Sequence, residues 1–232
     1  MINVHIIGGN LLYTQMFERF KSLSLVENIR EAHIVVFTGG EDVSPDLYGQ
    51  HKHPSTGSNP LRDDREIEIF NYAMKNKKFM IGICRGAQFL HVMCGGQLYQ
   101  NVEGHTRPHL IANYIDGPNE IVTSTHHQMM KLNQKDSTCT LLAEAIDEDY
   151  EAVMVDAEYM SNCDNQVKVL TEKARSIESL YHHGEFCFCF QPHPEFPNAD
   201  PTFQVFRVLF NYCWSKYLNS LRSIRITSLK DS

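Results

Sequence analysis

No apolar run in this sequence approaches the length that a membrane-spanning helix needs. The opening residues Met1–Ile7 are too short for a signal peptide and lack its basic start. Basic residues are in the minority, because 21 Lys and Arg face 28 Asp and Glu and leave a formal net charge of −7. A general nucleic-acid binder normally carries a basic face. We therefore predict a cytoplasmic protein that has neither a membrane nor a nucleic acid as its partner.

The seven cysteines lack a repeated Cys-x-x-Cys spacing, and their number is odd. In a chain without a secretion signal this predicts reduced thiols rather than disulfides. Cys94, Cys139 and Cys213 have apolar surroundings in the sequence, and we interpret them as small core side chains. The full Gly-x-Gly-x-x-Gly pattern of a dinucleotide loop is also missing after Gly8-Gly9, so no nucleotide cofactor is predicted.

The length of 232 residues suits one α/β domain, which we place at 1–221 with a weakly basic C-terminal tail at 222–232. Apolar runs at 33–37 and 79–83 indicate inner parallel strands that are covered on both faces. Helical signals then become sparse, and short strands are expected instead. We predict a mostly parallel sheet with antiparallel strands added at one side. The expected strands of this later region are 119–124, 139–146, 152–155 and 166–170.

Two further segments frame this sheet. A polar stretch rich in Pro, Gly and Ser, residues 50–65, predicts a long surface loop, and a helix follows from about Asp64 to Asn76. A last helix is expected from Pro201, and we expect it to fray beyond about Leu221.

Cys84 lies between the apolar run that ends at Ile83 and a segment whose apolar residues recur at helical spacing. Glycines at 82 and 86 flank it, and small neighbours permit the sharp strand-to-helix turn of a nucleophile elbow. A thiol at such a bend is open to a substrate, and the helix N-terminus stabilises its thiolate. The sequence therefore predicts a nucleophile at Cys84. The alternative is one more inert buried cysteine, which would not need the flanking glycines.

A base and an orienting group for this nucleophile occur far downstream in Gln191-Pro-His193-Pro-Glu195. The two prolines hold His193 in an extended backbone, and Glu195 can project from the same face to hydrogen-bond its ring. A histidine merely packed at a strand end is the alternative. If the strands are parallel, His193 and Cys84 both lie at C-terminal strand ends and can meet. The three side chains would then supply the chemistry of acyl transfer.

An acyl-transfer site also needs backbone donors for its oxyanion. The N–H of Arg85, just after the nucleophile, and an N–H of the Gly39-Gly40 turn are the candidates, although a Gly-Gly pair also fits a plain tight turn. The adjacent polar residues 125–128 at another strand end can serve a pocket or simply face solvent.

Zinc binding is a second interpretation of the segment around the histidine. The residues that could take part are His182, His183, Cys187, Cys189 and His193. Cys-x-Cys on one strand face differs from the usual loop spacing of zinc ligands, so no metal is predicted.

The run Gly82-Ile-Cys84-Arg-Gly-Ala-Gln88, together with Gln191–Glu195, resembles the class I glutamine amidotransferase superfamily. More narrowly, residues 38–49, the motif Arg62-Asp63-x-x-Glu66 and residues 124–128 are similar to the γ-glutamyl-γ-aminobutyrate hydrolase branch, peptidase family C26. The resemblance covers residues 32 to 212. Pro192 departs from the pattern, because an aromatic residue usually precedes the histidine in the family.

The resemblance implies a flavodoxin-like three-layer α/β sandwich and the hydrolysis of a γ-glutamyl amide through a thioester on Cys84, with no metal or organic cofactor. It implies a triad, an oxyanion hole and a substrate-binding segment. The triad would be Cys84, His193 and Glu195, the oxyanion hole the N–H groups of Gly40 and Arg85, and the substrate-binding residues Gln88, Ser124, Thr125, His126, His127 and Gln128.

The partner that the resemblance implies is a small γ-glutamyl molecule, and a homodimer is compatible with it. Residues 50–61 and 103–117 are expected to line the amine side of that substrate. The alternative function is a glutaminase subunit that passes ammonia to a separate synthetase. The absence of a fused synthetase domain and the Cys-Arg-Gly and Asp-Val-x-Pro motifs favour the hydrolase.

Overall fold

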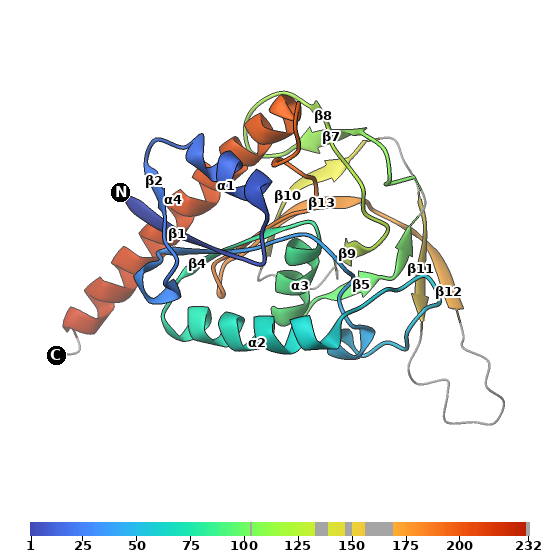
Figure 1. The fold of residues 1–232 in the computed structure, drawn as a ribbon, viewed down its shortest axis with the longest axis horizontal. Coiled ribbons are helices and arrows are strands. Elements are labelled where there is room, and N and C mark those ends of the chain that lie inside the picture. Colours follow the sequence, from blue (N-terminus) through green and yellow to red (C-terminus); the bar gives the residue numbers. More distant parts are fainter. Residues whose placement is uncertain (103, 133–138, 147–149, 156–168, 231–232) are drawn as a thin grey trace.

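The computed structural model describes residues 1–102, 104–132, 139–146, 150–155 and 169–230. Its centre is a mixed sheet in the order β2-β1-β3-β4-β14-β13-β10-β7-β8, and β5 and β9 extend it beside β13 (Figure 1). The bounds of these strands are β1 Ile2–Ile7, β2 Leu23–Leu25, β3 Ile34–Phe37, β4 Phe79–Ile83, β5 Gln97–Tyr99, β7 His109–Asn113, β8 Glu120–Val122, β9 Met129–Lys131, β10 Cys139–Ala145, β13 Ile177–His182 and β14 Cys187–Phe190.

Strand direction divides this sheet into two parts. From β2 to β14 the neighbouring strands run parallel, whereas from β14 to β8 they run antiparallel. The mostly parallel core with antiparallel strands on one side is therefore confirmed. A second, three-stranded sheet holds β6 (Asn101–Val102), β11 (Tyr150–Val155) and β12 (Val169–Ala174).

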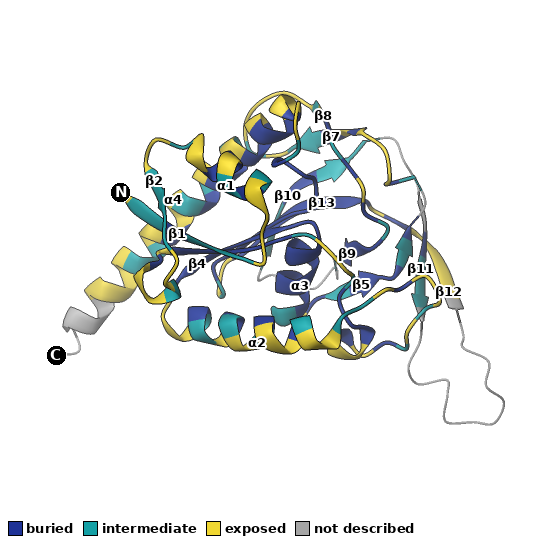
Figure 2. Cartoon of the chain, viewed as in Figure 1, coloured by how far each residue is buried: buried dark blue, intermediate teal, exposed yellow. Residues whose placement is uncertain are grey.

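Helices cover both faces of the main sheet, which makes three layers (Figure 1). Helices α2 (Pro60–Lys75) and α3 (Arg85–Met93) pack on one face, and α1 (Leu11–Glu18) and α4 (Asp200–Lys230) on the other. Strand β14 shows how its sequence serves both layers. Phe188 and Phe190 join the core beneath α1 and α4, while Cys187 and Cys189 join the core beneath α2 and α3. The central strands are accordingly buried throughout (Figure 2).

Helix ends differ from the sequence expectation at two places. Helix α2 begins at Pro60 rather than near Asp64, because the Asn59 side chain caps it by accepting the N–H of Arg62 and Pro60 occupies its first turn. Helix α4 continues to Lys230 instead of fraying beyond Leu221. Neither Gly nor Pro occurs between 202 and 230 to stop it. The division into a domain at 1–221 and a tail at 222–232 stays a prediction.

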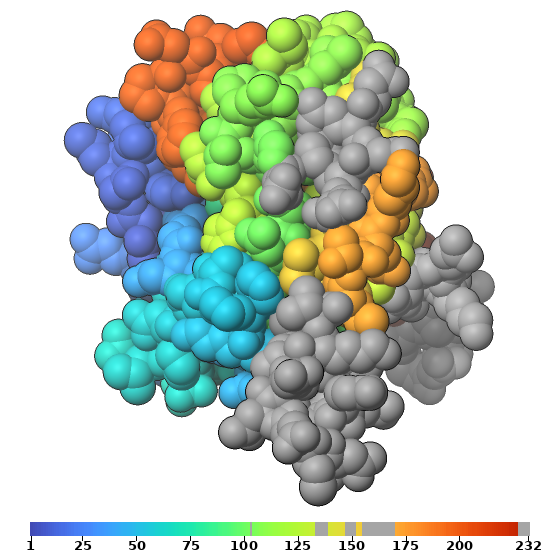
Figure 3. Space-filling model, turned by 90° about the vertical axis from the view of Figure 1, so that its right-hand side faces the viewer, coloured from blue at the N-terminus to red at the C-terminus, as the bar shows by residue number. Residues whose placement is uncertain are grey.

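The loop before α2 is less exposed than its composition indicated. The Gln50 side chain donates to the Leu98 carbonyl at 2.9 Å, and Gln100 accepts the N–H of His53 at 2.8 Å, so Gln50 and Thr56 are buried. In the view of Figure 3, cyan atoms of this loop adjoin green atoms of the segment that follows β6. Two of the loops that we expect on the amine side of the substrate thus share one face. Residue 103 lies outside the described residues.

Strands β5, β7, β9 and β13 were missed at the sequence level. Strand β13 is the clearest case, because Glu178, Ser179 and His182 are fully buried polar residues that interrupt its apolar pattern. In the described ranges, no helix combines the length and the apolar character that crossing a bilayer requires.

Candidate active site

Cys84 occupies the bend between β4 and α3, with φ 52° and ψ −112°. This left-handed φ is rare for a residue with a side chain. The flanking glycines make the bend possible by close packing. A Cβ at Gly82 would lie 2.4 Å from the carbonyl oxygen of Gly86, and one at Gly86 would lie 2.1 Å from that of Phe37. Helix α3 therefore sits directly against β3 and β4, and it presents the thiol at its N-terminus.

His193 follows β14 and is fixed through both its ring and its backbone. Its Nδ1 lies 2.7 Å from Oε1 of Glu195, and its ring stacks on Phe196 with centroids 4.3 Å apart. The hydroxyl of Thr123 accepts the backbone N–H of His193 and donates to its carbonyl oxygen. The bond to Glu195 sets the tautomer of the imidazole and leaves Nε2 for other partners.

The nucleophile and the base meet beside Gly39. A side-chain carbon at Gly39 would lie 3.4 Å from Cε1 of His193 and 3.5 Å from Cβ of Cys84. Burial alone would lower the pKa of His193, but the charge of Cys84, its hydrogen bond and the contact with Glu195 raise this pKa to about 10. His193 is therefore an imidazolium at neutral pH, and such a neighbour favours the thiolate form of a cysteine.

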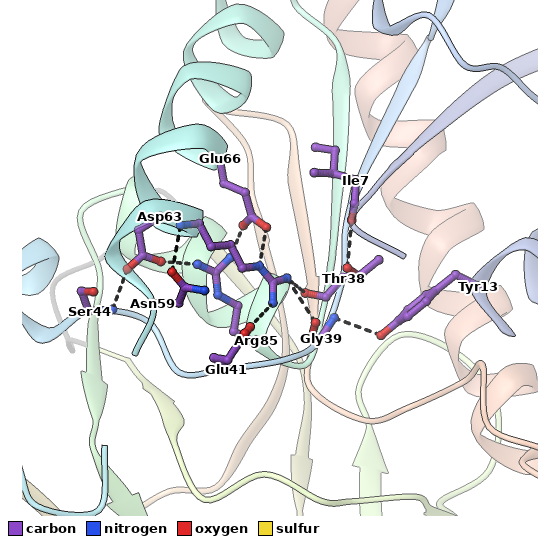
Figure 4. Close-up of polar contacts among 11 residues, drawn as sticks. Ile7, Tyr13, Thr38, Gly39, Glu41, Ser44, Asn59, Asp63, Glu66 and Arg85 are labelled. Atoms are coloured by element: carbon purple, nitrogen blue, oxygen red, sulfur yellow. Dashed lines mark hydrogen bonds and ion pairs between the residues drawn. The ribbon is translucent and has the colours of Figure 1, made fainter. Parts of the chain in front are cut away.

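The candidate oxyanion donors flank this pair. Gly40 has φ +141°, and no described residue accepts its N–H or that of Arg85. The N–H of Gly39 is occupied instead, because it donates to the hydroxyl of Tyr13 at 3.0 Å (Figure 4). Of the two glycines in this turn, Gly40 is thus the one that can offer an N–H to a ligand.

A buried ionic cluster supports the oxyanion turn from behind (Figure 4). The Arg85 guanidinium pairs with Glu66 and Asp63, and all three side chains are about 2% exposed. Arg62 pairs with the other oxygen of Glu66 at 2.8 Å and donates to the carbonyl oxygens of Thr38 and Gly39. The residue after the nucleophile is in this way tied through Glu66 to the turn that carries Gly40.

These supporting roles were not predicted. The motif Arg62-Asp63-x-x-Glu66 was noted only as a family mark, although its spacing on α2 puts Asp63 and Glu66 on one helix face. Tyr13 carried no signal at all. Its hydroxyl is buried next to Glu195 and Cys84, and burial and these two negative charges raise its pKa above the usual range.

The predicted substrate segment divides between the site and its surroundings. Thr125 lies at the site, with Oγ1 2.8 Å from Nε2 of His193. His127 reaches Asp42 of the oxyanion loop at 3.1 Å, and Asp42, after burial is offset, raises the His127 pKa. Gln88 donates to the carbonyl oxygen of Gln128 at 2.9 Å, and Ser124 donates to that of His105.

His126 points into a buried cluster around Glu178. Its Nε2 lies 3.6 Å from Oε1 of Glu178, which His109 contacts at 3.0 Å and His105 at 3.6 Å. Burial alone would raise the pKa of Glu178, yet His126 and His109 lower it below the usual range. The side chains of Ser124, His126 and Gln128 are thus almost fully buried, at 1–4% exposure. The structure brings Cys84, His193, Glu195, Thr125, Gly40 and Arg85 together and turns these three outward into neighbouring networks.

The five residues weighed as a zinc site do not gather. His182 pairs in register with Cys187 at the start of β14, whereas His193 lies beyond the other end of that strand. The order of these residues along β13 and β14 therefore separates them.

A cysteine elbow and a downstream histidine on this α/β sheet define a class I glutamine amidotransferase-like protein. The profile of the Peptidase C26 family matches residues 19–195, and the chain belongs to that family. It is 37% identical over 94 residues to the YvdE homolog of Lactococcus lactis subsp. cremoris, which is named as glutamine amidotransferase-like. The match covers 40% of this chain and 48% of that protein, so the chain spans about half the length of this curated relative.

Solved structures agree on the fold. A protein described as a GMP synthase component from Thermoplasma acidophilum covers 97% of this chain, with 98% of its own length, 16% identity and a TM-score of 0.59. A glutamine amidotransferase of Thermotoga maritima covers 97%, with 86% of its own length, 15% identity and a TM-score of 0.53. At such identities the likeness concerns the fold alone.

Proposed function

We propose that this protein hydrolyses a γ-glutamyl amide through a γ-glutamyl thioester, with Cys84, His193 and Glu195 as its triad. The observation that supports the proposal most strongly is the position of His193, which bonds Glu195 through Nδ1 and interacts with the thiol of Cys84. Family membership supports a hydrolase of the class I amidotransferase type.

In the first half of the reaction, the Cys84 thiolate attacks the γ-carbonyl carbon of the substrate. The oxyanion that forms receives the N–H groups of Gly40 and Arg85. The imidazolium of His193 then gives its Nε2 proton to the leaving nitrogen, the C–N bond breaks, and the amine departs. The glutamyl group stays on Cys84 as a thioester.

In the second half, His193 is neutral and accepts a proton from water as that water attacks the thioester carbonyl. Collapse of the second tetrahedral intermediate breaks the C–S bond and releases glutamate. Cys84 leaves as a thiolate beside a newly protonated His193, which restores the starting pair. Glu195 keeps its carboxylate on Nδ1 through both halves and stabilises each imidazolium.

The remaining predicted residues serve substrate binding in this proposal. Thr125 adjoins Nε2 of His193, and the pair of His127 and Asp42 joins the substrate segment to the oxyanion loop. The amine half of the substrate would extend toward the loop at 50–59 and the segment after β6, which share one face (Figure 3). We propose that the glutamyl half is held by Gln88 and the backbone of residues 124–128.

The test is a panel of γ-glutamyl amines together with glutamine, incubated with the purified protein and with Cys84→Ala. We expect glutamate release from at least one panel member and its loss in the variant. Equal release by both proteins would remove Cys84 from the mechanism.

A glutaminase subunit that delivers ammonia to a synthetase is the second candidate. It has support in the fold shared with the GMP synthase component, although that likeness concerns the fold alone. Release of ammonia from glutamine that is weak alone and rises when a synthetase partner is added would favour it. Efficient turnover of a γ-glutamyl amine by the isolated chain would favour the hydrolase.

A further inference from the structure

Three potential metal ligands meet at the end of α3 that lies opposite the nucleophile. They are Cys94 at the helix C-cap, His182 at the end of β13 and Glu185 in the turn before β14. One ligand atom from each, Sγ, an imidazole nitrogen and a carboxylate oxygen, lies within 4.8 Å of the other two. The proposed hydrolysis uses none of these groups.

Hydrogen bonds fix which nitrogen of His182 carries a proton. The carbonyl oxygen of Lys131 lies 3.0 Å from Nε2 of His91, so this nitrogen must donate and Nδ1 of a neutral His91 must accept. Nε2 of His182 lies 3.1 Å from that Nδ1 and therefore donates to it. The neutral His182 ring is left with a bare lone pair on Nδ1.

That lone pair has no hydrogen-bond partner among the described residues, although the His182 side chain is only 2% exposed. Burial first, and then the charges of His91 and His183, lower the pKa of His182 to about 3, so the ring stays neutral. An unpartnered buried nitrogen costs free energy unless something binds it. Histidines that bind a metal through one ring nitrogen usually donate the other N–H to a fixed acceptor, as His182 does here.

The other donors complete a ligand set. Cys94 is partly exposed and so is Glu185, which gives an ion access from solvent. Cys187 is buried beside them, hydrogen-bonds Cys94 and donates its thiol to the carbonyl oxygen of Glu185 at 3.5 Å. Thiolate, imidazole and carboxylate are the ligand types that Zn²⁺ takes in tetrahedral sites.

We propose that Cys94, His182 and Glu185 bind one Zn²⁺ ion, with the thiol of Cys187 available as the fourth ligand. Each coordinating thiol gives its proton to solvent as the Zn–S bond forms, and no electron is transferred. The ion would join the C-terminal end of α3 to the turn between β13 and β14. Because α3 begins at Cys84, the site would brace the helix that carries the nucleophile. The inference does not depend on which amide the protein hydrolyses.

The experiment titrates chelator-treated full-length protein with Zn²⁺ and, separately, with Co²⁺. The variants are Cys94→Ser and His182→Asn, and the matched control is His183→Asn, whose ring contacts Thr140 instead of the cluster. We expect wild type and control to bind one Zn²⁺ per chain, and both cluster variants to bind at least about tenfold more weakly. With Co²⁺, a thiolate-to-cobalt absorption band should appear in wild type and be absent in Cys94→Ser.

Two results would overturn the proposal. One is the absence of Zn²⁺ binding to wild type, including the case where mass spectrometry finds Cys94 and Cys187 joined as a disulfide after purification without reductant. The other is affinity in both cluster variants equal to that of wild type. If Cys94→Ser does not fold, His182→Asn and its His183→Asn control decide the question.

Discussion

His193 illustrates how a single side chain is prepared for proton transfer. Its backbone is tied to Thr123, one ring nitrogen is bonded to Glu195, and its ring lies on Phe196. These contacts leave the imidazole little freedom to rotate away from Cys84. Most of the cost of orienting the base is therefore met by folding rather than by substrate binding.

The raised pKa of His193 gives a pH prediction. The leaving amine needs the imidazolium, so kcat/KM should fall as pH rises through about 10, the pKa of His193 in the folded protein. Because this pKa lies above the ordinary histidine value of 6.5, the pairing stabilises the folded state fully below pH 6.5, and this contribution is lost as pH rises through about 10. Measurements of kcat/KM and of the free energy of unfolding against pH check both statements.

Glu195→Gln should move that alkaline limb to lower pH, because it removes a charge that holds the proton on His193. Since Glu195 orients the base, kcat should drop by roughly a hundredfold or more while KM changes little. An effect confined to KM, with an unmoved alkaline limb, would contradict the orienting role.

Residue roles were predictable where they depend on local pattern. Cys84 between two glycines and His193 two positions before Glu195 are short motifs whose chemistry can be read directly. Tyr13 and Arg62 act through partners that are distant in sequence, on the Gly39 turn and Glu66, and only the tertiary structure brings these groups into contact. The same holds for His126, whose cluster partner Glu178 lies on a strand that was missed.

The junction of α3 with β3 and β4 is the element contact on which the elbow depends. Gly86→Ala should destabilise the protein by about 1–3 kcal/mol, because its Cβ would lie 2.1 Å from the Phe37 carbonyl oxygen. Activity should fall further than stability, since α3 must shift and carry Cys84 with it. Gly184→Ala is the control, because a Cβ there meets nothing within 4 Å. Denaturant unfolding checks the prediction, and equal stability of the two variants would refute it.

Helix α2 contributes through the ionic cluster that it builds under the oxyanion turn. Glu66→Gln leaves two buried guanidinium groups, those of Arg85 and Arg62, short of a negative partner. We expect a loss of about 3–5 kcal/mol in the free energy of unfolding and a lower kcat. Glu68→Gln, on the exposed side of the same helix, should be close to neutral. Chemical denaturation of both variants makes the comparison, and similar values would show that the cluster does not stabilise the fold.

The elements that the sequence predicted are those with a simple apolar pattern. Strands β3, β4 and β14 are buried on both faces and consist almost wholly of apolar residues. Strand β13 was missed because its buried polar residues satisfy themselves with distant partners, as Ser179 does by donating to the carbonyl of Cys189. Periodicity detects burial of apolar side chains, and it is blind to buried polar ones.

The assembled chain places two kinds of chemistry at the two ends of α3. The acyl-transfer site lies at its N-terminus, where parallel strands β3, β4 and β14 end, and the proposed zinc site lies at its C-terminus. The antiparallel strands beyond β14 supply the substrate segment and the Glu178 cluster, so the extension of the sheet shapes the pocket rather than the triad.

The most direct test of the proposed mechanism is to trap the acyl-enzyme. The protein is mixed with a γ-glutamyl substrate that it turns over, quenched in acid within a turnover and digested for mass spectrometry. We predict a glutamyl group on the peptide that contains Cys84, formed before glutamate is released and absent in Cys84→Ala. Turnover without an adduct on Cys84, or an adduct on a different side chain, would contradict it.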